Sequence, residues 1–405
     1  MKEIYECDFA IIGGGIMGLT LALELSQMAS SSRILVIEKE DQLGFHASGR
    51  NSGVLHAGFY YSTESLKAKH CRDGNALMKE FLSERGIPLN SCGKVVVTKS
   101  ESEIPILETL FSRGRDNGIN LELLPAEKLV NYESQAKTIG KFIWSPETAV
   151  TNPKIVIKEL ATLLNQRGVK FFLGQSAVLK STQSKILVET NQCKINAKWI
   201  LNAAGAFADK LAKQVGVGTE YVPIPFLGKY LAAQGDQNSA KRLIYPVPKL
   251  ENPFLGNHLT ITPERLFKIG PTAWPTFGRE NYKGNFPILK RETYEISHNL
   301  IKFVKTNPRI ALKHFATEIK KLSRQNQARD IQQIFTSING LGKLKEYPSG
   351  IRSQLYNIEE GSLEQDFVIK THLNSIHLLN LVSPGWTASF SLSKSIVNNI
   401  PHAQD

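Results

Sequence analysis

Short apolar runs and longer amphipathic stretches alternate along the first forty residues of the chain. Residues 9–12 and 34–37 are wholly apolar, which is typical of strands buried on both faces of a parallel sheet. Between them, residues 16–28 repeat leucine on or near one face of a helix. A strand, a helix and a second strand within about 30 residues predict a parallel β-α-β unit.

The remaining sequence predicts further helices and strands. Helices are expected over residues 104–118 and 152–168, which have helical spacing and end near glycine. From residue 287 to about residue 333 the pattern is that of amphipathic helix, with a break near Pro308. Strands are expected at 186–188, 199–201 and 376–382, the last followed by a turn and a final helix.

A glycine fingerprint of the form G-x-G-x-x-G joins the first strand to the first helix. Its residues are Gly13, Gly14, Gly15, Ile16, Met17 and Gly18. Gly13 permits a tight turn, Gly15 lets the backbone approach a pyrophosphate, and Gly18 lets the helix pack closely on the sheet. The helix N-terminus offers unpaired N–H groups to phosphates. Glu38 ends the next strand, where its carboxylate can accept a ribose hydroxyl, so we predict a dinucleotide site.

The fingerprint fits both NAD and FAD, and two other loops favour the longer cofactor. Residues 46–53 form a small-residue loop soon after the second strand, and residues 383–385 precede the final helix. Both could turn backbone toward a large flat ring. The expected cofactor contacts are Gly13, Gly15, Ile16, Met17, Gly18, Glu38, Lys39, Ser48, Asn51, Ser52, Gly53, Ala204, Gly205, Gly385, Trp386 and Thr387.

Composition narrows the class of protein. The chain is 41% hydrophobic and 21% charged, which excludes a disordered chain, a collagen and a membrane bundle. Its four cysteines are scattered without paired spacing, so neither a disulfide framework nor a metal site is expected. No secretion signal or spanning stretch is visible in the sequence. We therefore expect a cytoplasmic protein, or one peripheral on the inner face of the membrane.

The formal net charge of +12 is unevenly distributed. Residues 279–345 hold 14 lysines and arginines against 5 acids, a net of +9. These helices are either a solvated surface or a basic face that docks on anionic lipid. Nucleic acid is not expected as a partner, because aromatic residues are not interleaved as stacking platforms would be.

Several motifs carry a resemblance to known proteins. The N-terminal unit resembles FAD-dependent oxidoreductases of the D-amino-acid oxidase superfamily. Residues 51–61, which read NSGVLHAGFYY, are similar to the L-2-hydroxyglutarate dehydrogenase/oxidase family. Further similar stretches lie at 65–68, 92–94, 202–205, 244–248, 253–260, 270–271 and 350–354.

This resemblance implies a fold and an activity. The fold is an α/β flavoprotein with a Rossmann-like FAD-binding domain and a discontinuous α+β substrate domain. Two domains also suit the length of 405 residues. The FAD-binding domain would take residues 1–85, 141–215 and 341–405, and the substrate domain residues 86–140 and 216–340, with basic helices over 279–340.

The implied reaction oxidises L-2-hydroxyglutarate to 2-oxoglutarate by hydride transfer to flavin N5. Residues 340–342 lack the strand and helix of a second nucleotide fingerprint, so electrons are expected to pass to a quinone, a carrier protein or oxygen. One alternative is an FAD-dependent oxidase or dehydrogenase of another 2-hydroxy acid, glycerol phosphate or amino acid. A second alternative is a basic flavin-bearing binding protein without redox activity.

The expected reaction requires a base and a cationic side chain that binds the substrate carboxylate. His56 and His258 lie in the family-like motifs, and either could take the hydroxyl proton. Arg352 can hold a carboxylate through two parallel N–H bonds. Leu227 stands where the family usually has a basic residue, so a second carboxylate would be held less well. Weaker substrate-binding candidates are Lys229, Arg50, Tyr60, Tyr61 and Tyr245.

Overall fold

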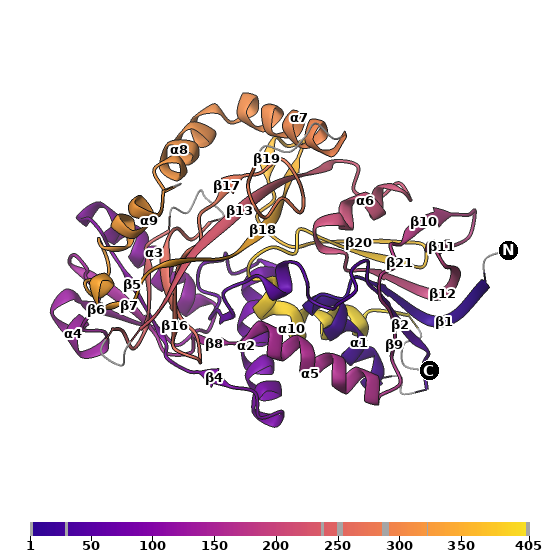
Figure 1. Cartoon of the computed structure of the whole chain (residues 1–405), viewed down its shortest axis with the longest axis horizontal. Helices are drawn as coiled ribbons and strands as arrows, with labels where there is room; N and C mark the ends of the chain where they lie inside the picture. Colours follow the sequence, from indigo (N-terminus) through magenta and orange to yellow (C-terminus); the bar gives the residue numbers. More distant parts are fainter. Residues whose placement is uncertain are drawn as a thin grey trace.

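In a computed structural model the described strands form three β-sheets, with helices packed around them (Figure 1). The structure describes residues 3–28, 31–235, 239–248, 254–285, 291–321 and 323–401. The expected helix start at residue 287 and Pro253 of one family-like stretch lie outside these residues. Among the described helices, none is long and apolar enough to cross a membrane.

The first sheet has eight strands and is built around the predicted β-α-β unit. β1 (Glu3–Ile12) lies between β2 (Ile34–Ile37) and β12 (Cys193–Asn202), and both pairings are parallel. β21 (Ser375–Leu379) continues the parallel order beyond β12. The other strands are β9 (Lys170–Phe172), β10 (Val178–Ser181), β11 (Ile186–Glu189) and β20 (Val368–His372).

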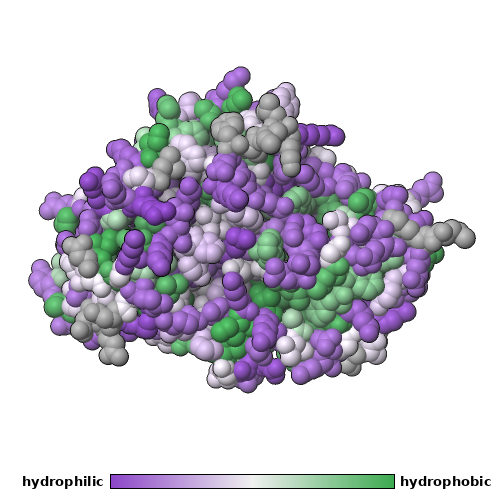
Figure 2. All heavy atoms as spheres, in the orientation of Figure 1, coloured by the Kyte–Doolittle hydropathy of each residue, from purple (hydrophilic) through white to green (hydrophobic). Residues whose placement is uncertain are grey.

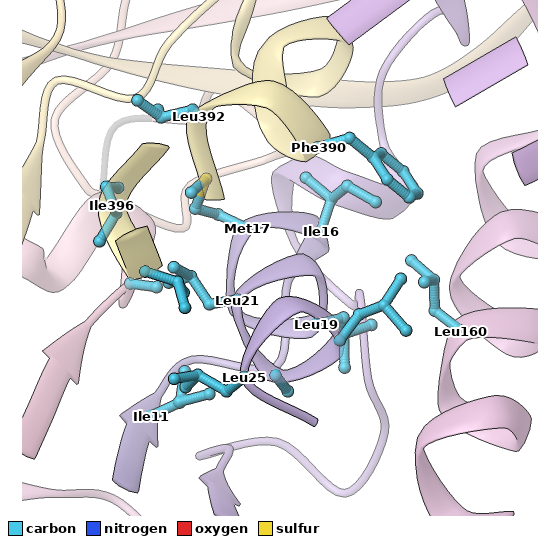
Figure 3. Close-up of a cluster of buried hydrophobic side chains, with 14 of the residues drawn as sticks. Ile11, Ile16, Met17, Leu19, Leu21, Leu25, Leu160, Phe390, Leu392 and Ile396 are labelled. Carbon is cyan, nitrogen blue, oxygen red and sulfur yellow. The ribbon is translucent and has the colours of Figure 1, made fainter. Parts of the chain in front are cut away.

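One helical layer forms the main core against this sheet. α1 (Ile16–Met28) is buried along most of its length, because α10 (Gly385–Asn398) and α5 (Pro153–Gln166) cover the surfaces that the sheet leaves open. Figure 3 shows Leu19 facing Leu160 of α5, and Ile16 beside Phe390 of α10. A helix that is apolar all round needs such enclosure. α2 (Leu66–Glu84) packs on the far side of α10.

The second sheet has ten strands and stands beside the first (Figure 1). Its long ribbon pairs β13 (Tyr221–Gln234) with β18 (Lys345–Asn357), with a register shift between Gly228 and Tyr230. The other strands are β5 (Lys94–Val97), β6 (Glu122–Pro125), β7 (Lys141–Ser145), β14 (Leu243–Pro246), β15 (His258–Ile261), β16 (Leu266–Gly270), β17 (Trp274–Pro275) and β19 (Ser362–Leu363). A small third sheet joins β3 (Val54–Leu55), β8 (Ala149–Thr151) and β4 (Leu89–Asn90).

Several helices surround this second sheet. α7 (Arg291–Thr306), α8 (Pro308–Ile319) and α9 (Arg324–Ile331) form an arch over β13 and β18 (Figure 1). α3 (Ile104–Asp116) packs on β6 and β7, and α6 (Ala208–Lys213) lies between the two large sheets. The remaining described helix is the single turn α4 (Leu129–Tyr132).

The predicted elements agree with the structure except in pairing and extent. The β-α-β unit, the helices near 104–118 and 152–168, and the break at Pro308 are confirmed. The expected strand at 376–382 ends earlier, because Asn380 turns into a left-handed conformation with φ 54°. β7 and β18 pair with β5 and β13 in the ten-stranded sheet, although both were predicted within FAD-binding segments. Periodicity along one segment does not reveal its distant partner.

Candidate active site

A cavity of about 700 Å³ separates the two large sheets. Its first wall is the loop at the carboxyl ends of β1 and β2, the position where open parallel sheets bind ligands. Its second wall comes from β13, β14, β15 and β18. The start of α10 closes one side. The cavity is therefore lined both by the loops that are predicted to bind a nucleotide and by strands that could contact a substrate.

Two glycines of the fingerprint stand where there is no room for a side chain. Gly13 has φ 114°, and a Cβ there would overlap the carbonyl of Ala203. A Cβ on Gly18 would overlap the carbonyl of Gly13, so this glycine sets the contact between α1 and the turn. Gly15 lines the cavity, and a Cβ there would lie 2.9 Å from the Ser48 hydroxyl.

The carboxylate of Glu38 is held in place beside this turn. Gly14 N donates to its Oε2 at 2.7 Å and Glu40 N donates to its Oε1 at 2.9 Å. Each carboxylate oxygen has a further lone pair, so Glu38 can still accept a ribose hydroxyl. Ser48 also touches the fingerprint, since its Oγ accepts from Ile16 N at 2.9 Å. The predicted nucleotide contacts thus lie together.

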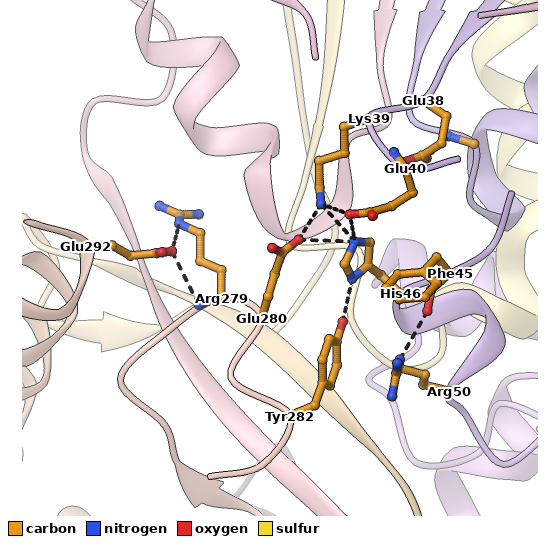
Figure 4. A network of polar contacts seen from close by, with 11 residues as sticks. Glu38, Lys39, Glu40, Phe45, His46, Arg50, Arg279, Glu280, Tyr282 and Glu292 are labelled. Atoms are coloured by element: carbon orange, nitrogen blue, oxygen red, sulfur yellow. Dashed lines mark hydrogen bonds and ion pairs between the residues drawn. The ribbon is translucent and has the colours of Figure 1, made fainter. Parts of the chain in front are cut away.

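A polar cluster joins the loop after β2 to the loop after β17 (Figure 4). The Lys39 ammonium pairs with Glu40 and Glu280 and lies 2.9 Å from His46 Nε2. His46 Nδ1 is 2.7 Å from the Tyr282 hydroxyl. Glu40, His46 and Glu280 could ligate a metal, but the Lys39 ammonium already occupies the centre of this group. The cluster fastens the two walls of the cavity to each other.

Two arginines strengthen this junction. Arg50 lies over the Tyr282 ring at 4.1 Å and its Nε donates to Phe45 O at 3.1 Å. Arg279 is fully buried, and its Nη2 is 2.9 Å from Asp209 Oδ2 on α6. Arg50, like Lys39, lines the cavity as predicted, but both side chains are engaged in holding the walls together.

At the other end of the cavity, three rings are arranged in a row. Tyr245 stacks on His258, with ring centroids 3.8 Å apart, and His56 meets the same tyrosine edge-on at 6.4 Å. His258 Nδ1 is 2.9 Å from the carbonyl of Gly256. A carbonyl only accepts, so Nδ1 carries the hydrogen and Nε2 of neutral His258 has a free lone pair. His258 is therefore a proton acceptor in a fixed orientation.

Burial controls the charge of both histidines. It lowers the pKa of His56 to about 3, with the nearby Lys94 adding to the effect. It also lowers the pKa of His258 well below its usual value, and His56, Arg352 and Lys94 act in the same direction. Both rings are neutral near pH 7, which is the form that accepts a proton.

Arg352 projects into the cavity from β18 with most of its donors unused. Its Nη1 donates to the carbonyl of Thr272 at 3.3 Å, and the guanidinium lies 5.6 Å from the Phe254 ring. No carboxylate pairs with it among the described residues. A guanidinium in this condition suits the carboxylate of a ligand.

Three predicted substrate contacts, Lys229, Tyr60 and Tyr61, do not line the cavity. Lys229 lies between Gly228 and Tyr230, which both line it, so the alternation of β13 turns Lys229 to the opposite face. Tyr60 packs on Phe59 behind the lining, with ring centroids 4.3 Å apart. Leu227 is buried in β13.

Of the other predicted cofactor contacts, most line the cavity and two lie behind the residues that line it. Gly53 and Thr387 stand behind the lining, where Gly53 O accepts from Thr151 N and Thr387 Oγ1 accepts from His56 N. Those that line the cavity are Gly13, Gly15, Ile16, Met17, Glu38, Lys39, Ser48, Asn51, Ser52, Ala204, Gly205, Gly385 and Trp386.

The lining fits a large cofactor with a polar ring. His56 Nδ1, Tyr245 Oη and Trp386 Nε1 are buried and have no hydrogen-bond partner among the described residues. Buried polar groups are normally satisfied, so these atoms point to a ligand or to bound water. Together with the glycine turn and Glu38, they fit the dinucleotide and the flat ring that the sequence predicts.

Comparison with known proteins agrees with this geometry. Residues 8–398 match the family described as FAD dependent oxidoreductase. L-2-hydroxyglutarate dehydrogenase of Escherichia coli K12 is 31% identical, covering 97% of this chain and 93% of its own. The mitochondrial L-2-hydroxyglutarate dehydrogenase of Homo sapiens is 30% identical, covering 97% and 88%.

Solved structures show the same fold. FAD-bound L-α-glycerophosphate oxidase from Mycoplasma pneumoniae superposes with a TM-score of 0.77 at 22% identity, covering 97% of this chain and 94% of its own. Glycine oxidase from Geobacillus kaustophilus gives 0.74 at 18% identity, covering 98% and 94%. The chain thus belongs to the family of FAD-dependent oxidoreductases, as its glycine turn, Glu38 and cavity indicate.

Proposed function

We propose that this chain oxidises L-2-hydroxyglutarate to 2-oxoglutarate. The observation that supports the proposal is the placement of Arg352 and His258 at one end of a cavity whose other end fits FAD. An anion grip and a fixed proton acceptor are what a 2-hydroxy acid requires. The similarity to L-2-hydroxyglutarate dehydrogenases over nearly the full chain supports the same substrate.

Groups from both ends of the chain would hold the cofactor. The Gly13–Gly15 turn and the α1 N-terminus would hold the pyrophosphate, and Glu38 would bind the ribose. The loop at 48–52 and the start of α10 would hold the ring. FAD, when bound, would accept a hydride from the substrate carbon.

The chain's own residues would orient the substrate and take its hydroxyl proton. Arg352 would bind the carboxylate next to the reacting carbon through two N–H donors. His258 Nε2 would accept the hydroxyl proton, because Gly256 fixes the other ring nitrogen as a donor. His56, on the far side of Tyr245, is the second candidate for this role.

Anaerobic reduction tests the substrate directly. The purified yellow holoenzyme is expected to lose its flavin absorbance when mixed with L-2-hydroxyglutarate, because only a correctly held substrate reduces the flavin. Stopped-flow absorbance measures the rate, with the D-enantiomer as control. Faster bleaching by lactate, glycerol phosphate or an amino acid would assign one of those substrates instead. If none of these compounds bleaches the flavin, the proposal of an oxidoreductase for small hydroxy or amino acids fails.

We also propose that α7 and α8 dock on an anionic membrane, where a quinone could receive the electrons. Their exposed apolar side chains lie beside lysines and arginines, and Figure 2 shows apolar and hydrophilic atoms mixed at the top of this face. Such a surface suits the headgroup region of anionic lipid. The apolar residues are Tyr294, Ile301, Leu312 and Ile319.

Flotation with anionic vesicles tests this docking. We expect the protein to float with phosphatidylglycerol vesicles at low salt and to be released at high salt, because surface charge is screened. Leu312→Asp, on the proposed face, should reduce flotation several-fold. Val130→Asp, at an exposed apolar residue on α4, should not. Absence of flotation at low salt would favour a soluble carrier or oxygen as acceptor.

A further inference from the structure

Lys94, the first residue of β5, is completely buried. Its ammonium lies 4.5 Å from the centroid of the Phe59 ring, 4.6 Å from that of Tyr60 and 4.9 Å from that of Tyr245. Aromatic rings stabilise a cation near their faces, so the three rings form a cage for the ammonium.

No negative charge compensates Lys94. Its Nζ has no hydrogen-bond partner among the described residues, and none of their ion pairs includes it. Burial lowers its pKa to about 7, with Cys71 acting against this. A buried ammonium without a counter-ion is costly, since it has lost its hydration. Below its pKa, Lys94 is therefore a buried cation without a counter-ion among the described residues.

The surrounding titratable groups are neutral or positive. Burial raises the pKa of the Cys71 thiol on α2 to about 12 and raises the pKa of Tyr60 and Tyr245 further. It lowers the pKa of both histidines, as described above. Tyr61, next to the cage, also has a raised pKa. Arg352 on β18 is the other cation that acts on His258. Near pH 7 the charge at this end of the cavity is thus positive.

Lys94 lies immediately behind the cavity lining. Tyr245 and His56 line the cavity, and Tyr245 belongs to the cage. The Lys94 charge also helps to lower the pKa of His56 and His258, the two histidines that line the cavity. In a dry interior, charges interact more strongly and over longer distances than in water.

We propose that Lys94 is a specificity-determining residue whose buried ammonium supplies the second positive charge for a dicarboxylate substrate. It would act by its field, through Tyr245 and His56, while Arg352 makes direct contact with one carboxylate. The inference rests on the proposed dicarboxylate substrate and names the residue that selects it.

Binding of glutarate, a dicarboxylate that has no hydroxyl to oxidise, tests the inference without turnover. Titration calorimetry on the holoenzyme at pH 6 is expected to show about tenfold weaker binding for Lys94→Met than for the wild type. The loss should be smaller for butyrate, which has one carboxylate. A merely structural role would weaken both ligands equally.

The pH dependence has a definite sign. The ammonium is charged below its pKa and neutral above it, whereas both carboxylates of glutarate are ionised from pH 7 to 9. Wild-type affinity for glutarate should therefore fall as pH rises through and above 7. Lys94→Met should have lower affinity at pH 6 and should lose this dependence.

Stability provides a second readout. The folded pKa of Lys94 lies below its unfolded value near 10.5, so the cost of burying the charge is greatest below pH 7 and shrinks as pH rises. Lys94→Met should then melt at the same temperature as the wild type or higher, most clearly at pH 6. If this variant does not retain FAD, Lys94→Gln replaces it in the same measurements.

The matched control is Lys268→Met. Lys268 is also buried, lies 4.4 Å from the Tyr347 ring and has its pKa lowered to about 8, but it does not line the cavity or touch the cage. The Lys268→Met substitution should leave glutarate binding unchanged. Equal glutarate affinity of Lys94→Met and wild type at pH 6 would overturn the inference. Failure of the wild type to bind glutarate at any pH would overturn the dicarboxylate proposal itself.

Discussion

Replacing Arg352 with methionine is expected to lower kcat/KM for L-2-hydroxyglutarate by about a hundredfold or more, with FAD still bound. A charged hydrogen bond is worth about 1.5–3 kcal/mol, and a two-donor grip on a carboxylate lies at the upper end. The guanidinium has no carboxylate partner among the described residues, so its loss leaves no buried acid unpaired. The fold should therefore survive the change.

The matched substitution is Arg352→Lys, which keeps the charge but removes the paired donors. We expect it to recover only part of the lost activity, and steady-state assays over a range of substrate concentrations separate kcat from KM. Lys229→Met, at a lysine of the neighbouring strand that faces away from the cavity, should behave like the wild type. Full activity of Arg352→Met would remove Arg352 from the substrate site.

Gly18→Ala is expected to give protein that does not retain FAD. A Cβ at this position would overlap the carbonyl of Gly13, so α1 would have to move away from the turn that faces the cofactor. Overpacking of rigid backbone costs about 3 kcal/mol or more, which is a large part of the stability of a domain. The yield of yellow protein and its melting temperature measure the loss.

Gly340→Ala is the control for this change. Gly340 is exposed, and the nearest atom to an added Cβ would be 3.9 Å away. The FAD content and melting temperature of the Gly340→Ala protein should equal those of the wild type. A Gly18→Ala protein that binds FAD normally would show that the turn adapts, and the close contact of α1 with β1 would then not be needed for cofactor binding.

The cofactor half of the site could be predicted from the sequence because its signals are local. The glycine turn, Glu38 and the apolar strands lie within 40 residues, and each has a fixed place in a β-α-β unit. Ser48 and Trp386, which were predicted as cofactor contacts, both line the cavity. These residues follow directly from the ends of predicted elements.

The substrate half depends on contacts between distant segments. Lys229 was predicted as a cation for the substrate, yet its position in the alternation of β13 puts it on the other face. Pairing and register decide such orientation, and neither can be read from one strand. Glu280 and Tyr282 were missed because their partners precede them by more than 200 residues.

Lys94, which we propose as a charged residue of the site, was not predicted as one from the sequence, although its motif was noticed. It is a lysine at the start of the run Lys94–Val97, which is otherwise all valine. A charge in an apolar strand is a signal in itself, because burying it is costly. Only the structure shows that three aromatic rings surround it and that Tyr245 connects it with the cavity.

The order of strands in the first sheet has a consequence for synthesis of the protein. β1 leaves the ribosome first, but its neighbour β12 follows after β5, β6 and β7 of the other sheet. The apolar surface of α1 stays uncovered still longer, until α10 is made. Nascent chains therefore carry a strand with one unpaired edge and an exposed helix through most of translation, and such surfaces are what chaperones bind.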